Sequence, residues 1–129
     1  MDPDYLRDLF ASFRPVTVRG MFGGAGIYSD GVMFALVAVG AIYLKADETN
    51  IPDFEREGQP PFQYQAKHGK RAVMSYWRMP ERLYDDPDEL AQWAGRSLAV
   101  AQRMAVPKQK VVPKRKAARP PRLNSGRAP

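Results

Sequence analysis

The fold of this 129-residue chain is decided by the stretch Asp30-Gly31-Val32-Met33-Phe34-Ala35-Leu36-Val37-Ala38-Val39-Gly40-Ala41-Ile42-Tyr43-Leu44-Lys45. The Asp-Gly pair is a strong signal for a two-residue hairpin turn, because both turn positions need a positive φ. Residues 32–39 are almost wholly apolar, which predicts a central strand that is covered on both faces or nearly so. Gly40 turns the chain again, and residues 41–45 form the return strand.

A short amphipathic helix is expected before this stretch, at the N-terminus. Asp2 can cap it, and Pro3 suits the first helical position because no N–H is needed there. The apolar residues that follow share one stripe at helical spacing: Tyr5, Leu6, Leu9, Phe10 and Phe13. The residue before a proline avoids the α region, so Arg14-Pro15 ends the helix.

A strand pattern with a glycine-rich interruption connects this helix to the Asp30-Gly31 turn. Residues 16–19 are β-branched in character, and residues 27–29 resume the pattern after the run Gly23-Gly24-Ala25-Gly26. One bulged strand and two short strands both explain this pattern.

A second helix is expected after the return strand, over residues 47–57. Asp47 or Thr49 could cap it, Pro52 fits only in its first turn, and Gly58 ends it.

The rest of the domain reads as a hairpin and a long helix. Residues 62–65 and 72–77 form the hairpin across residues 67–70. Asp86-Pro87-Asp88-Glu89 has the capping, proline and acidic residues of a helix start. Apolar residues then share one face over about five turns, and Pro107 ends this helix.

The order of elements is therefore α-β-β-β-α-β-β-α, and hairpin links imply antiparallel pairing. The sequence predicts a two-layer α+β fold, with one antiparallel sheet of about five strands and the helices packed on one face. The predicted domain covers residues 1–106. Residues 107–129 are rich in proline and basic residues, and we expect a disordered tail there.

The composition indicates the cellular compartment of the protein. The longest nearly apolar run, residues 32–44, is too short for a membrane helix, and the acidic N-terminus does not resemble a secretory signal. The chain has no cysteine, so it has neither a disulfide framework nor a thiolate metal site. We expect a cytoplasmic protein without a membrane contact.

The net charge of +6 is unevenly distributed along the chain. The tail holds eight of the 20 basic residues and none of the 14 acidic ones, which leaves residues 1–106 with 12 basic and 14 acidic residues. The domain is therefore mildly acidic and the tail is basic. The tail cations are Lys108, Lys110, Lys114, Arg115, Lys116, Arg119, Arg122 and Arg127.

No motif of the sequence predicts catalytic, cofactor-binding or metal-binding residues. The glycine run is followed by strand residues rather than a helix, so a bulge or a close backbone approach explains it better than a phosphate loop. The single histidine, His68, lies in a basic turn without a group to orient it. The acidic cluster at residues 85–89 is explained by helix capping.

Aromatic residues of the predicted strands leave two interpretations open. Stacking on single-stranded nucleic acid is one use for them, and core packing or cross-strand pairing is the other. The net acidic charge of the domain favours the second interpretation. The residues are Tyr28, Tyr43, Tyr64, Tyr76 and Trp77.

The run Arg19-Gly20-Met21-Phe22-Gly23-Gly24-Ala25-Gly26-Ile27-Tyr28 resembles the N-terminal domain of the TfoX/Sxy family of competence regulators. The similarity continues at residues 30–37 and 42–47, at Pro61-Phe62-Gln63-Tyr64 and at the helix start 86–90, and covers about residues 3–105. Competence-regulating members usually have a second, helical domain where this chain has its basic tail.

The resemblance implies a two-layer α/β fold with a single bulged strand before Asp30. It also implies a regulatory role alongside a transcription factor, and it supplies no catalytic residues. We therefore expect a non-enzymatic regulatory or adaptor domain that binds a protein partner, with the oligomeric state, monomer or dimer, left open. The expected contact surface is the glycine-rich bend, with Arg19, Phe22, Gly23, Gly24, Gly26 and Tyr28.

Two alternatives accompany this expectation. The basic tail could bind DNA or RNA through phosphate contacts. A small-ligand site could use the glycine-rich bend with Lys45 or Tyr64, which would require a deep polar pocket there.

The tail alternative is tested by deleting residues 107–129 and measuring retention of DNA over a salt series. Eight cations without an acid predict binding at low salt that falls steeply as salt rises, with a slope of about −0.9 per phosphate contact. Deletion should abolish the retention. Equal retention by both proteins would show that the tail is not the nucleic-acid contact.

Overall fold

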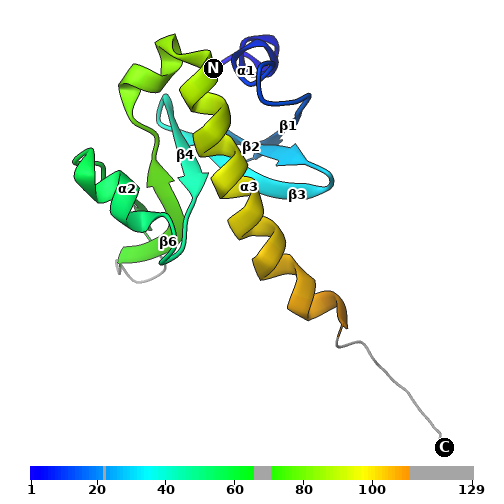
Figure 1. Ribbon diagram of the computed structural model, residues 1–129, viewed down its shortest axis with the longest axis vertical. Helices are drawn as coiled ribbons and strands as arrows, with labels where there is room; N and C mark the ends of the chain where they lie inside the picture. The colour runs from blue at the N-terminus through cyan, green and yellow to red at the C-terminus, as the bar shows by residue number, and fades with distance from the viewer. Residues whose placement is uncertain (22, 66–70, 111–129) are drawn as a thin grey trace, which may run out of the picture.

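The computed structural model describes residues 1–21, 23–65 and 71–110 (Figure 1). Its strands are β1 (Thr17–Met21), β2 (Gly24–Ser29), β3 (Val32–Ala38), β4 (Ala41–Lys45), β5 (Pro61–Gln65) and β6 (Arg71–Arg78). Its helices are α1 (Pro3–Leu9), α2 (Ile51–Arg56) and α3 (Pro87–Lys110), with a 3₁₀ turn, η2 (Glu81–Asp85), before α3.

The described strands form one antiparallel sheet in the order β1-β2-β3-β4-β6-β5. This confirms the predicted α+β fold, but the expected number of about five strands was too low, because the sheet has six. The glycine-rich run separates two strands that pair with each other, from Thr17 opposite Tyr28 to Met21 opposite Gly24. Gly23 has a φ of 78°, and this left-handed conformation makes the reversal possible. The single bulged strand implied by the resemblance was therefore wrong.

Three helices cover one face of the sheet. Figure 1 shows α3 crossing in front of the strands, with α1 and α2 to either side of it. Phe10 of the N-terminal segment packs edge-on against Phe34 of β3, with ring centroids 5.7 Å apart. Phe54 of α2 packs against Trp93 of α3 at 5.0 Å. These side chains belong to one continuous core between the helices and the sheet.

A β-bulge in β3 supplies this core with an extra side chain. Ile27 pairs with Ala35 and Tyr28 pairs with Met33, so Phe34 has no partner on β2. Phe34 and Ala35 are consecutive, yet both are fully buried in the core. The bulge therefore lets two successive residues face the helices, where regular alternation would allow one.

An arginine joins the elements at one end of the helical layer. The guanidinium of Arg82 in η2 donates to both carboxylate oxygens of Glu57, at the end of α2, and to both of Glu89, in α3. Hydrogen bonds from Arg82 and from the indole of Trp93 lower the pKa of Glu89 to about 2. Glu89 therefore stays ionised across the neutral range, and its ion pair with Arg82 persists there.

The helix boundaries refine the sequence predictions. Asp2 caps α1 by accepting from the backbone N–H of Asp4 at 3.0 Å, as predicted. In contrast, α2 starts after Asn50 rather than after Asp47 or Thr49. The side-chain amide of Asn50 accepts a hydrogen bond from the backbone N–H of Asp47 and donates one to the backbone carbonyl of Lys45, so it joins the end of β4 to the start of this helix. Pro107 was expected to end the last helix, but α3 continues to Lys110. A proline in a final turn removes one backbone hydrogen bond and does not prevent the turn.

The two hairpin turns that flank β3 have the same backbone but different residues. Asp30 and Gly31 have φ values of 53° and 76°, which confirms the predicted turn. Val39 and Gly40 have φ values of 51° and 72°, although a β-branched residue is strained in this region. The Val39 side chain is 96% exposed, so packing does not compensate for the strain.

Replacement of Val39 by asparagine should therefore stabilise the protein. Asparagine tolerates a positive φ and Asn-Gly is favoured in such turns, so Val39→Asn should raise the free energy of unfolding by about 1 kcal/mol. Urea unfolding measures this change. The matched control is Asp30→Val in the other turn, which should lower the stability. A loss of stability in Val39→Asn would contradict the strain at this turn.

Candidate interaction face

The face of the sheet opposite the helices carries none of the described helices, and we call it the open face; Arg19 and Met21 at its edge are exposed, whereas Leu36, Ala41 and Tyr76 are buried by their neighbours. It is defined by alternation along the strands, since Val18, Ile27, Ile42, Leu44 and Trp77 point into the core. Its described residues include Thr17, Arg19, Met21, Gly24, Gly26, Tyr28, Met33, Leu36, Ala38, Ala41, Tyr43, Lys45, Phe62, Tyr76 and Arg78, and the ring of Phe62 lies 4.9 Å from that of Tyr43. Most of these residues are apolar or aromatic.

The strand register aligns five residues of the open face in one row across the sheet, the central row. The row runs through Arg19, Gly26, Leu36, Tyr43 and Arg78, each paired with the next on the neighbouring strand. Neighbouring strands lie about 4.8 Å apart, so its two arginines are about 19 Å apart along the backbone. Both ends of the row are cationic, and the residues between them are uncharged.

The glycines of β2 shape the middle of the open face. A Cβ added to Gly26 would lie 2.7 Å from the sulfur of Met33, 3.1 Å from the ring of Tyr28 and 3.3 Å from the sulfur of Met21. The two thioethers and the tyrosine ring therefore close around the bare backbone of Gly26. A Cβ added to Gly24 would lie 2.0 Å from the carbonyl oxygen of Val37, so β2 and β3 approach too closely there for any side chain.

Two cation–π contacts hold basic side chains on the open face. The guanidinium of Arg19 lies 5.2 Å from the ring centroid of Tyr28, and the ammonium of Lys45 lies 4.6 Å from that of Tyr76. Lys45 also donates to the hydroxyl of Ser75 at 2.8 Å. Burial raises the pKa of Tyr76 to about 12, so this ring stays neutral and serves as a platform for Lys45.

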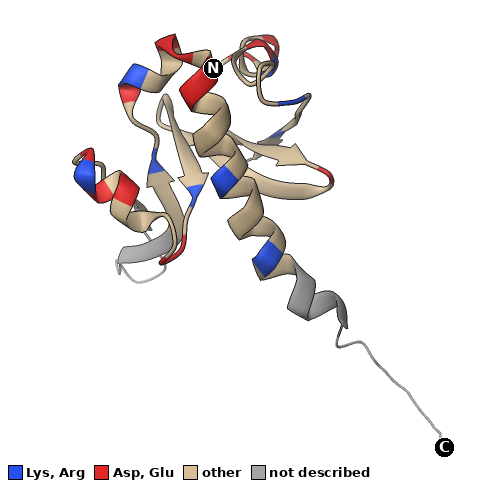
Figure 2. Cartoon of the chain, in the orientation of Figure 1, with Lys and Arg blue, Asp and Glu red and all other residues tan. Residues whose placement is uncertain are grey.

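Charge is segregated between the two sides of the molecule. None of the six strands contains an aspartate or glutamate. Figure 2 shows the acidic residues on the helices and loops, whereas blue segments lie both on the helices and on the strands. The mild net negative charge of the domain therefore belongs to the helical side, and the open face is positive.

The arginines of the open face also differ from the other arginines in their ion pairs. Those outside the open face with described side chains each lie within ion-pair distance of a carboxylate: Arg7, Arg14, Arg56, Arg82, Arg96 and Arg103. Within the described part of the chain, Arg19 and Arg78 at the two ends of the central row have no such carboxylate. The exposed guanidinium of Arg19 is therefore available to a partner, whereas Arg78 is partly buried and lines the cavity described below.

The structure brings together most of the residues predicted for the glycine-rich bend. Arg19, Gly24, Gly26 and Tyr28 lie on the open face, and Gly23 makes the turn between β1 and β2. Phe22 lies outside the described residues. Lys108 and Lys110 lie in the last turn of α3, and the other six tail cations, from Lys114 to Arg127, lie outside the described residues.

Sequence reasoning missed the far half of the open face, which includes Leu36, Tyr43 and Arg78. These residues lie 10 to 52 positions beyond Gly26 in the chain, and strand pairing alone brings them beside it. One signal was present in the sequence, because every predicted strand lacks acidic residues although the domain as a whole is acidic.

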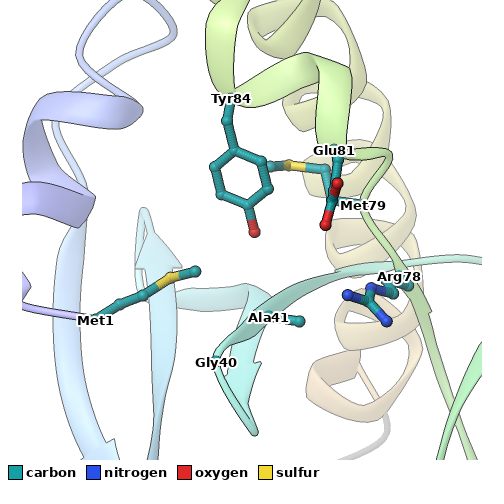
Figure 3. Close-up of a pocket in the computed structure, with 7 residues that line it drawn as sticks. All are labelled: Met1, Gly40, Ala41, Arg78, Met79, Glu81 and Tyr84. Carbon is teal, nitrogen blue, oxygen red and sulfur yellow. The ribbon is translucent and has the colours of Figure 1, made fainter.

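A small cavity lies beyond one end of the open face, next to the Val39-Gly40 turn. Its volume is about 200 Å³, and Met1, Gly40, Ala41, Arg78, Met79, Glu81 and Tyr84 line it. Figure 3 shows the hydroxyl of Tyr84 pointing into this cavity. The cavity contains neither the glycine-rich run nor Lys45, so it does not supply the pocket that the small-ligand alternative requires.

Metal-binding clusters and membrane-spanning helices are both absent among the residues that the structure describes. No group of three or more histidine, aspartate or glutamate side chains among them could hold a metal ion. None of the described helices combines the length and the apolar character that crossing a membrane requires.

The fold and the open face define the class of this protein as a small α+β domain with an antiparallel sheet covered by helices on one side. The family model of the TfoX N-terminal domain matches residues 8–101, and the chain belongs to this family. The match runs from α1 into α3 and confirms the resemblance seen in the sequence. No curated protein matches the chain.

The close approach of β2 and β3 at Gly24 predicts that alanine destabilises the protein at Gly24 but is tolerated at Gly20. Gly24→Ala should lower the free energy of unfolding by about 2 kcal/mol or more, because the new methyl group meets backbone that cannot move aside. Gly20→Ala is the matched control. No atom lies within 4 Å of a Cβ at Gly20, so the change there should be within about 0.5 kcal/mol. Equal stability of the two variants in urea unfolding would contradict the contact between β2 and β3.

Proposed function

We propose that this chain is a non-enzymatic regulatory domain of the cytoplasm, and that it acts by docking a protein partner onto its open face. Membership of the TfoX N-terminal domain family supports a regulatory role. A transcription factor is the kind of partner that this family relationship favours.

The observation that carries the proposal is the pair Arg19 and Arg78, which have no carboxylate within ion-pair distance among the described residues and lie on a face rich in apolar and aromatic side chains. An arginine whose charge is needed for the stability of the domain would have a carboxylate beside it, as the arginines of the helical side do. Arginine and aromatic residues are enriched in protein interfaces, and both are concentrated here. The open face therefore has the composition of a contact surface rather than of a solvent-exposed one.

The test is affinity capture from an extract of cells that express the protein. The variant that carries Arg19→Glu and Arg78→Glu should lose a protein that the unchanged chain retains, because both ends of the central row then repel an acidic partner. A loss of at least about tenfold in the retained amount is expected for two charge reversals at an interface.

The matched control carries the same charge change on the helical side, as Arg7→Glu and Arg56→Glu. Both arginines make exposed pairs three positions from their aspartates, and such pairs contribute little to stability. Circular dichroism shows whether the variants keep their fold. Identical sets of retained proteins for all three chains would refute the proposal.

A further inference from the structure

We infer that the outer edge of β1 pairs with an extended strand of the protein partner, which adds to the six described strands as a seventh, antiparallel one. The added strand has an acidic residue opposite Arg19. We call this place the β1 edge, and it consists of the outward main-chain groups of Val18 and Gly20. The inference rests on the proposed function and specifies how the partner is held.

The two edges of the sheet differ in their protection against strand pairing. β1 and β5 are the edge strands of the described sheet. β5 begins with Pro61, which has no N–H, and its pairing with β6 is irregular between Pro61 and Gln63. A proline and a bulge are two devices that keep an edge from pairing with another chain. β1 contains no proline and pairs regularly with β2 from Thr17 to Met21. β1 is therefore the edge to which another strand can add.

The hairpin of β1 and β2 determines which main-chain groups point outward. Met21 and Gly24 flank the two-residue turn, and the pair that flanks such a turn exchanges both of its hydrogen bonds. Hydrogen-bonded and non-hydrogen-bonded pairs alternate along an antiparallel ladder, so every second residue of β1, counted back from Met21, bonds to β2. The N–H and C=O groups of Val18 and Gly20 point the other way. They offer two donors and two acceptors to an added strand.

The side chains of β1 leave this edge uncovered. Arg19 and Met21 are exposed, and both lean over the neighbouring strand. The guanidinium of Arg19 lies over the ring of Tyr28, and the sulfur of Met21 lies 3.3 Å from a Cβ added to Gly26. Apart from its chain neighbours, no described atom lies within 4 Å of a Cβ at Gly20. An added strand therefore meets bare backbone in the middle of the edge.

The charge of Arg19 selects an acidic residue on the added strand. Arg19 has no carboxylate within ion-pair distance in the described part of the chain. In an antiparallel pair, the residue directly opposite has its Cβ about 4.5–5.5 Å away. A cation–π contact at an exposed site is weak, so a carboxylate at this position can draw the guanidinium of Arg19 away from Tyr28.

The same charge disfavours two other occupants of the edge. A second copy of β1 in the register that pairs Val18 with Gly20 would place Arg19 opposite Arg19, and like charges directly opposite each other destabilise a strand pair. The segment 107–129 of the chain itself contains no aspartate or glutamate. A strand of a different protein with one acidic residue matches the edge better.

The experiment is a fluorescence anisotropy titration of the full chain with the labelled peptide Ser-Thr-Val-Glu-Val-Thr-Ser at low salt. In antiparallel pairing its glutamate lies opposite Arg19, and its two valines lie opposite Gly20 and Val18. N-methylation of the second valine removes an N–H that points to β1, and it should weaken binding about tenfold. N-methylation of the glutamate changes only the outer side of the added strand, and it should leave the affinity within about twofold.

Two variants test the same contact from the side of the protein. Gly20→Pro removes an outward N–H, keeps the bonds of β1 to β2 and should abolish binding. Circular dichroism shows whether this variant is folded. Arg19→Glu should weaken binding about tenfold, and it should prefer the peptide in which lysine replaces glutamate by a similar factor. Arg56→Glu, at an exposed arginine of α2, is the matched control and should bind as the unchanged chain does.

Four outcomes of these titrations would overturn the inference: no binding of the peptide, equal effects of the two N-methylations, unchanged binding by a folded Gly20→Pro variant, or failure of the charge exchange at Arg19. Sedimentation of the free chain gives a fifth. A dimer that Gly20→Pro dissociates would show that a second copy occupies the edge.

The proposed function is tested separately, with Gly20→Pro in the affinity capture. If this variant keeps the partner while the double variant Arg19→Glu and Arg78→Glu loses it, the inference fails and the proposed function stands. If both variants keep the partner, the two claims fail together. Loss of the partner by both variants is the result that the inference predicts.

Discussion

The open face depends on the burial of Phe34 on the opposite side of the sheet. Side chains alternate along a strand, so a regular β3 would send Phe34 and Ala35 to different faces. The bulge opposite Ile27 and Tyr28 puts both into the core, where Phe34 packs against Phe10 and Phe13. The same shift assigns Met33 and Leu36 to the open face. One extra residue in β3 therefore completes the core and determines which residues lie in the middle of the open face.

The charges follow from this two-sided arrangement. Helices and loops have room for ion pairs, and their arginines lie beside aspartates and glutamates, as in the junction of Arg82 with Glu57 and Glu89. The strands carry basic residues and no acidic ones, so the open face keeps an unbalanced positive charge at Arg19 and Arg78. Two chemically different surfaces result, and the one without helices has the features of a binding surface.

The sequence was sufficient for the three helices, for most of the strands and for the antiparallel pairing of strands joined by hairpins, but not for the separate β1 and β2 or for the pairing of β4 with β6. The Asp30-Gly31 turn, the turn at Gly40, the cap at Asp2 and the helix start at Asp86 are local signals, and each lies where it was predicted, although Val39 belongs to the turn and not to the strand. The glycine-rich run was harder to interpret, because glycines are typical both of a bulge within one strand and of a turn between two strands. The positive φ of Gly23 and the contact of Gly24 with Val37 show that here the glycines make a turn and a close strand approach.

The residues that share the open face were predicted in half. Arg19, Gly26 and Tyr28 are close in sequence and could be grouped by their spacing, whereas Tyr43 and Arg78 join them through a register that involves four strand pairings. A bulge also changes that register by one residue, and periodicity does not locate it. The net acidic charge of the domain disfavoured a nucleic-acid contact on the sheet. A net charge does not show on which side of the molecule the acidic residues lie.

The most direct test of the account is a map of the binding surface by NMR of the methionine methyl groups. Met21 and Met33 report on the open face, Met79 reports on the core, and the exposed Met104 reports on α3 on the helical side. The account predicts that the protein partner retained in affinity capture shifts the signals of Met21 and Met33 and leaves that of Met104 unchanged. A shift of Met104 with Met21 and Met33 unchanged would place the contact on the helices and contradict the role of the open face.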